Sequence, residues 1–212
     1  SAAGDVALTG GLGASQIGAL GLVGGAAAPG YFRVLPPSLD TTAAAGSLRL
    51  LPDENTGAVL FPAAGGLLSA WAGGDIVLGS SSNTPNLALA DSAPASWPGV
   101  RTPVARTSGL VIGTDGLVAT TLAGTADNQA LRSADARPIA LHAGGSLRMD
   151  GDATLLLPKA SLLSAGGDIV NLRVAGQNLQ AGDVSRISAG GDYLAGQLGD
   201  VSWGGPGLLV LQ

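Results

Sequence analysis

The chain has 212 residues and a net charge of −5, and 35 of its residues are Gly while only 12% are charged. Because Gly weakens a helix interior by about 1 kcal/mol relative to Ala, this composition argues against long helices. The acidic balance, with no basic run, argues against nucleic-acid binding and against a polybasic membrane patch. The absence of Cys excludes disulfides, a thiolate nucleophile and a zinc–thiolate site.

The first segment along the chain, residues 6–32, carries no charged side chain, so two interpretations are open for it. A membrane-spanning helix needs about 20 predominantly apolar residues. Eight glycines and a proline interrupt this window, which favours strands and turns rich in Gly and Ala. We expect no signal peptide at Ser1, because neither a basic region nor a compact apolar core is visible there.

Two proline-rich stretches follow, at residues 25–64 and 80–138. Pro has no N–H to donate to a sheet ladder, so we expect excursions that leave the sheets and return to them. Within the second stretch, residues 109–117 show a weak strand pattern and are candidates for extra coils. We expect residues 1–212 to form a single segment of one fold, with these two excursions.

The phrase A-G-G recurs along the chain, beginning at Ala72, Ala143, Ala165 and Ala189. The last three copies follow one another at a nearly constant interval, and the longer gap from Ala72 to Ala143 is close to three such intervals. A recurring phrase indicates a unit that stacks on copies of itself, and a period near 23 fits one coil of a parallel β-solenoid. We assign the structural turns of this unit to Gly73, Gly74, Asp75, Gly144, Gly145, Gly166, Gly167, Asp168, Gly190, Gly191 and Asp192.

The residues around each phrase form chemically uniform columns when the copies are aligned on their alanine. The apolar columns lie two residues before and four residues after it, at Ala70, Leu141, Leu163 and Ile187, and at Ile76, Leu147, Ile169 and Tyr193. The position directly before the alanine is mostly polar, so the alternation predicts a strand, a turn and a second strand. The resulting stacked pairs are Leu163 with Ile187, Ala165 with Ala189, and Ile169 with Tyr193.

We expect the glycines of these turns to supply positive φ. We expect each Asp to accept hydrogen bonds from the backbone N–H groups that follow it. The sequence thus predicts an all-β parallel β-solenoid with coils of about 22–24 residues and with loops outside the coils.

The most specific motifs lie in the last third of the chain: Leu156-Leu157-Pro158-Lys159, Gly176-Gln177-Asn178-Leu179 and Asp183-Val184-Ser185-Arg186-Ile187. With the A-G-G-D-I phrases, they make the chain resemble exoproteins of the filamentous haemagglutinin family, which use two-partner secretion. The resemblance implies a right-handed parallel β-helix within a very long fibrous protein. It also implies passage through an outer-membrane β-barrel transporter and a location that is secreted or on the bacterial cell surface, associated with the outer membrane.

The same resemblance implies roles in adhesion, biofilm formation, cell–cell contact or toxin delivery. The secretion domain and the toxin-like domain of such exoproteins have no counterpart in these residues. We therefore expect an internal segment of a longer exoprotein.

Few residues are candidates for chemistry. His142 is the only histidine, and its column places it in an outward slot without a second His or any Cys, so we expect a surface histidine. Asp150 and Asp152 flank a glycine, which is more typical of a turn than of a glycosidase carboxylate pair. The turns also lack the nine-residue spacing of calcium-binding repeats, so we expect no metal and no cofactor.

The candidates for ligand binding lie in the larger excursion, at Trp97, Arg101 and Arg106. An exposed aromatic ring with two guanidinium groups suits a glycan or protein partner. The competing interpretation is an ordinary loop in which Trp97 packs against the solenoid wall.

The sequence therefore predicts a non-catalytic structural and adhesive segment. Its expected partners are a host or bacterial surface glycan or protein, and neighbouring β-helix coils of the same parent or of other chains. The alternative is a β-helix protein that degrades or binds polysaccharide, and degradation would need a cleft with two or three Asp and a Lys or Arg. An ice- or mineral-binding face would need outward Thr ladders, and the pairs at 41–42 and 120–121 do not recur.

Overall fold

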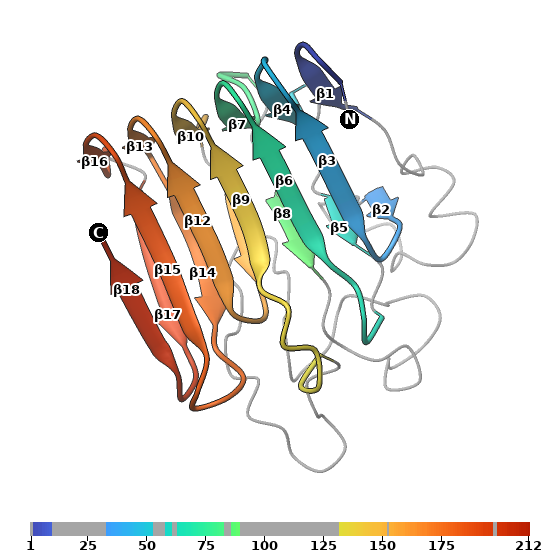
Figure 1. Ribbon diagram of the computed structural model, residues 1–212, viewed down its shortest axis with the longest axis vertical. Coiled ribbons are helices and arrows are strands. Elements are labelled where there is room, and N and C mark those ends of the chain that lie inside the picture. Colours follow the sequence, from blue (N-terminus) through green and yellow to red (C-terminus); the bar gives the residue numbers. More distant parts are fainter. Residues whose placement is uncertain are drawn as a thin grey trace, which may run out of the picture.

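The described part of the chain consists of parallel β-sheets and contains no helix. The structure is a computed structural model, and it describes residues 2–9, 33–52, 58–60, 63–82, 86–89, 132–151, 153–196 and 199–212. Its strands form three six-stranded sheets. Figure 1 shows the strands of one sheet side by side at the front, with those of another behind them.

Each sheet takes every third strand of the chain, always with parallel neighbours. Sheet 1 holds β1 (Val6–Leu8), β4 (Leu48–Leu50), β7 (Ile76–Leu78), β10 (Leu147–Met149), β13 (Ile169–Val170) and β16 (Tyr193–Leu194). Sheet 2 holds β2 (Arg33–Leu35), β5 (Ala58–Leu60), β8 (Asn86–Leu89), β11 (Thr154–Leu157), β14 (Arg173–Gln177) and β17 (Asp200–Gly204). Sheet 3, at the front of Figure 1, holds β3 (Leu39–Ala43), β6 (Leu68–Ala72), β9 (Ile139–Ala143), β12 (Ser161–Ala165), β15 (Val184–Ala189) and β18 (Leu208–Leu211). We call three successive strands, one from each sheet, a coil.

The predicted stacking of like residues is confirmed by the register of the sheets. Leu163 pairs with Ile187 and Ala165 with Ala189 between β12 and β15, and Ile169 pairs with Tyr193 between β13 and β16. Because side chains alternate along a strand, the first, third and fifth residues of β6, β9 and β12 are buried. The second and fourth residues of these strands point to the outer face. The stacked inward columns of Leu, Ile and Ala form one continuous apolar core.

The long gap between the first two A-G-G phrases, from Ala72 to Ala143, is a single coil, and its interpretation as three intervals is wrong. Ile76 of β7 pairs directly with Leu147 of β10, so no further coil lies between them. Residues 109–117, which were expected to form extra coils, lie outside the described ranges. The additional length of this coil falls between β8, which ends at Leu89, and β9, which begins at Ile139.

The expected excursion at residues 25–64 also needs correction, because strands β2 to β5 lie within it and belong to the three sheets. Its prolines are compatible with the ladder since Pro36, Pro37 and Pro52 fall between strands. Similarly, the range 80–138 contains β8, which pairs with β5 and β11. In the described residues, no helix is both long and apolar enough to cross a bilayer, and most of the uncharged window at 6–32 lies outside them.

The glycines of the repeated turns are required for close stacking, and the expectation of positive φ is wrong for them. Among the described glycines, positive φ occurs only at Gly79, Gly151, Gly196 and Gly205. A Cβ on Gly166 would instead collide with the backbone carbonyl of Gly144 in the preceding coil. A Cβ on Gly190 would collide in the same way with Gly166. The first glycine of each pair thus leaves room for the turn it stacks on.

The residue after each glycine pair forms a ladder along the coils. Asp75 accepts a hydrogen bond from Ser146 N–H at 2.7 Å, and Asp168 accepts one from Asp192 N–H at 2.9 Å. Ser146 continues the ladder by accepting from Asp168 N–H through its hydroxyl at 3.3 Å. Each side chain therefore binds the equivalent residue of the next coil, not the N–H groups that follow it, because stacking brings equivalent positions closer than the local turn does.

Candidate functional site

The outer face of sheet 3 carries the most varied column of the described coils. Thr42 pairs with Trp71 and Trp71 with His142, and the column continues to Ser164 and Ser188. The inward neighbours one residue later are Ala at every one of these coils. Packing therefore fixes the inward column, whereas the outward column is free to differ from coil to coil.

Three members of this column interact with one another. The Trp71 ring, 40% exposed, stacks on the His142 ring with centroids 6.2 Å apart and an interplanar angle of 21°. His142 Nδ1 lies 2.7 Å from Ser164 Oγ, within hydrogen-bond distance. Neighbouring strands lie about 4.8 Å apart, so outward side chains at paired positions are close enough to contact one another.

The His142–Ser164 pair has the contact expected of a base and a hydroxyl nucleophile. Within the described ranges, no carboxylate forms a hydrogen bond or an ion pair with His142 that would orient the ring. The pair stands on the outer surface of a sheet whose backbone N–H groups are engaged in the ladder. As predicted, His142 is an exposed surface histidine.

An apolar groove of about 400 Å³ lies on the same outer face, over β12 and β15. The exposed side chains of Leu162 and Val184 line it together with Arg186, and Ser164 and Ser188 line its polar side. This combination of apolar, hydroxyl and guanidinium groups suits the side chain of another protein better than a small charged metabolite.

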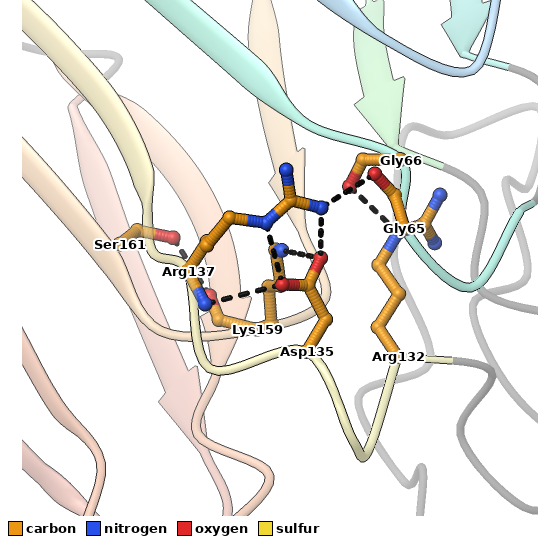
Figure 2. A network of polar contacts seen from close by, with 7 residues as sticks. All are labelled: Gly65, Gly66, Arg132, Asp135, Arg137, Lys159 and Ser161. Carbon is orange, nitrogen blue, oxygen red and sulfur yellow. Dashed lines mark hydrogen bonds and ion pairs between the residues drawn. The ribbon is translucent and has the colours of Figure 1, made fainter.

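A second cluster lies beside sheet 3, just before β9, and Figure 2 shows it at close range. Asp135 binds Lys159 Nζ at 2.8 Å and Arg137 Nε at 2.9 Å. Lys159 is almost fully buried, with 2% of its side chain exposed. Arg137 also donates to the carbonyl of Gly65 at 2.7 Å, and Arg132 donates to that of Gly66 at 3.4 Å.

The electrostatics of this cluster favour a permanent ion pair. Hydrogen bonding from Arg137, supported by Lys159, holds the pKa of Asp135 below its usual range. Burial lowers the pKa of Lys159, while the Asp135 carboxylate opposes that effect. The carboxyl group therefore stays ionised at neutral pH, and it holds the segment 132–138 against the β5–β6 connection and the turn before β12. We call these residues, Arg132, Asp135, Arg137 and Lys159, the Asp135 clamp.

Most of the candidate residues chosen from the sequence lie outside the part of the chain that the structure describes. Trp97, Arg101 and Arg106 lie outside the described residues, as does Asp152. Asp150 forms an ion pair with Arg148 at 3.0 Å, which satisfies the carboxylate at a turn. Within the described ranges, no group of three or more potential metal-ligating side chains is present.

Sequence reasoning missed both the Trp71–His142 stack as a surface feature and the Asp135 clamp. Trp71 and His142 were already aligned in one outward column, so their contact was a direct consequence of the register. Lys159 is the only Lys of the chain and follows an apolar strand, which was a signal for a buried partner.

Comparisons with known proteins give no match, whether to family models, to curated proteins or to solved structures.

Proposed function

We propose that the chain is a non-catalytic, right-handed parallel β-helical segment of a large secreted fibrous exoprotein, and that it acts in adhesion, biofilm formation or cell–cell contact. The pairing of every strand with the third strand after it carries this proposal. Such pairing makes the chain wind through three sheets and return one strand spacing further along. Parallel strand connections within a sheet are right-handed in about 98% of cases, which supports the proposed hand.

The inward columns are more exposed at the last coil than in the coils before it. Tyr193 and Leu211 stand in inward columns whose earlier members, Ile169 and Ile187, are buried, yet Tyr193 is 43% and Leu211 is 60% exposed. A pocket of about 550 Å³ opens among these side chains at that end of the stack. A further coil with the same columns would bury them, and its backbone would extend each of the three sheets.

The resemblance of the three sequence motifs carries the proposed membership of the filamentous haemagglutinin family, and their residues contact one another in the fold. Pro158 accepts a hydrogen bond from the Gln177 side chain at 2.9 Å, and Ser185 donates one to Asn178 at 2.6 Å. The first motif thus contacts the second across neighbouring coils, and the second contacts the third within one coil. With that membership we propose a secreted or cell-surface location, with an outer-membrane β-barrel transporter as a partner during secretion and a surface glycan or protein as the adhesive target.

Adhesion of coated beads tests this function. Beads carrying the purified chain are counted on bacterial and epithelial cell layers, against beads that carry an unrelated β-sheet protein of similar net charge. We expect at least about fivefold more chain-coated beads on one of the two surfaces. If chain-coated beads and control beads are equally numerous on each of the two cell layers, the adhesive role is ruled out.

The alternative, a polysaccharide-degrading protein, is separated by incubating the chain with several uronic-acid polymers. Release of unsaturated products would support that alternative. Polymer binding without release would instead favour a polysaccharide-binding protein.

A further inference from the structure

A second outward column of sheet 3 has opposite charges near its two ends. The register aligns Asp40, Ser69, Ala140, Leu162, Arg186 and Val210. Asp40 on β3 and Arg186 on β15 are both exposed. Four strand spacings separate them, which is about 19 Å. Between them stand only small or apolar side chains.

The same face carries a projection and a hollow at matching places. Trp71 projects from β6, one strand away from Asp40. The groove over β12 and β15 is lined by Leu162, Ser164 and Arg186. The projection and the hollow lie on opposite sides of β9, the strand midway between Asp40 and Arg186.

We propose that the chain forms a twofold-symmetric dimer through the outer face of sheet 3. The axis runs parallel to the strands and passes over β9, so that β3 of one copy faces β15 of the second copy and β6 faces β12. Asp40 then lies against the second copy's Arg186, and Trp71 enters the groove beside the second copy's Ser164. Both contacts occur twice, as a twofold interface requires.

Apolar exposure on this face supports a protein occupant. Among the described residues, the exposed large hydrophobic side chains include Trp71, Leu162, Val184 and Leu208, all of which lie outward on sheet 3. The column charges restrict the occupant further, because a second copy in reversed order places each charge opposite its complement. A copy in the same order would place Asp40 against Asp40 and Arg186 against Arg186, which is repulsive.

The size of the face sets the strength of the dimer. The five facing strands, β3, β6, β9, β12 and β15, at about 4.8 Å each, and five residues at about 3.3 Å each, give a footprint of roughly 400 Å² for each copy. Stable interfaces bury about 800 Å² for each partner. The dimer is therefore weak and concentration-dependent. The inference rests on the outward face alone and stands independently of the proposed adhesive function.

Sedimentation equilibrium of the full chain between about 5 and 500 μM tests the proposal. We expect the wild-type chain to dimerise within this range, and Asp40→Arg or Arg186→Asp to raise the dissociation constant at least about tenfold, since each creates two like-charge contacts. Trp71→Ser has the same direction of effect. Arg49→Asp, which reverses an exposed charge on sheet 1, leaves the dissociation constant unchanged.

The decisive result comes from mixing the Asp40→Arg and Arg186→Asp variants. In reversed order the two variants complement each other at both charge contacts, so the mixture regains the wild-type dissociation constant, as does the doubly substituted chain. A wild-type chain that is monomeric at all concentrations overturns the proposal. A dimer insensitive to both charge reversals overturns it as well, and failure of the mixture to associate overturns the reversed order. Far-UV circular dichroism of each variant confirms that its sheets are retained.

Discussion

Replacing Gly166 by Ala places a methyl group against the turn of the preceding coil. The Cβ would collide with the carbonyl of Gly144, a backbone group that no rotamer change can move aside. The same turn is held by a hydrogen bond from Gly166 N–H to the carbonyl of Ala143 at 2.8 Å. The two coils must therefore separate locally, which strains this hydrogen bond and the packing around it.

The expected loss follows from these two contributions. Overpacking in a fixed environment costs about 1–3 kcal/mol, and the net loss of one backbone hydrogen bond costs about 1 kcal/mol. We expect Gly166→Ala to lower the free energy of unfolding by about 2–4 kcal/mol. Gly182→Ala is the matched control, because a Cβ there meets no atom within 4 Å and its φ is not positive.

Urea unfolding followed by circular dichroism measures both variants. We expect Gly182→Ala to remain within about 0.5 kcal/mol of the wild-type chain, with an unchanged dependence on urea. If Gly166→Ala is equally mild, the coils are not packed closely at their turns, and the steric account of the glycine pairs is wrong.

Three further predictions use the same unfolding assay. Asp135→Asn leaves the charge of Lys159 buried without a counter-ion, so we expect a loss of about 2–4 kcal/mol at pH 7. Because the pKa of Asp135 is lower in the folded than in the unfolded chain, its stabilisation is present above the unfolded pKa of about 4 and is lost as the pH falls below that value. The free energy of unfolding of the variant therefore depends less on pH than that of the wild-type chain. An equal dependence in the two chains contradicts the clamp. Asp75→Ala removes an acceptor of the turn ladder and costs about 1–2 kcal/mol, whereas Asp75→Asn retains an acceptor oxygen and costs less; equal losses would contradict the hydrogen bond. Leu163→Ala empties a buried position and costs about 2–5 kcal/mol, whereas Leu162→Ala, on the outer face, costs less than about 1 kcal/mol; the reverse order would show that the strand register is wrong.

The stacking of coils was predictable because it depends on a repeated local pattern. A single alignment on the A-G-G phrase gave the pairs Leu163–Ile187 and Ile169–Tyr193, both of which the register confirms. Counting residues did not give the number of coils, because a connection between two strands changes length without changing the register at its ends. For that reason the whole stretch from Ala72 to Ala143, which pair with each other, makes only one coil.

The Asp135 clamp could not be derived in the same way. Lys159 and Asp135 are held together by the path of the segment 132–138 over the turn before β12, and that path leaves no periodic trace in the sequence. The glycine pairs were located correctly, but their physical role depends on the distance to the neighbouring coil at Gly144 and Gly166. The sequence shows where a glycine stands. Only the stacked coils show whether that position needs glycine for its backbone conformation or because no space is left for a Cβ.

The two faces of sheet 3 show where recognition can arise in such a stack. Its inward column beside the turn is Ala in every coil from β3 to β15, since stacked coils of equal width leave the same space at each level. The outward column one residue earlier changes from Thr42 through Trp71 and His142 to Ser188, although it shares the same register and strand spacing. Packing thus keeps the inward column uniform, whereas the exposed outward column is free to vary. Any interaction that distinguishes one coil from the next must use these outward columns or the connections between strands, and Trp71 with Arg186 is the combination that the described surface offers.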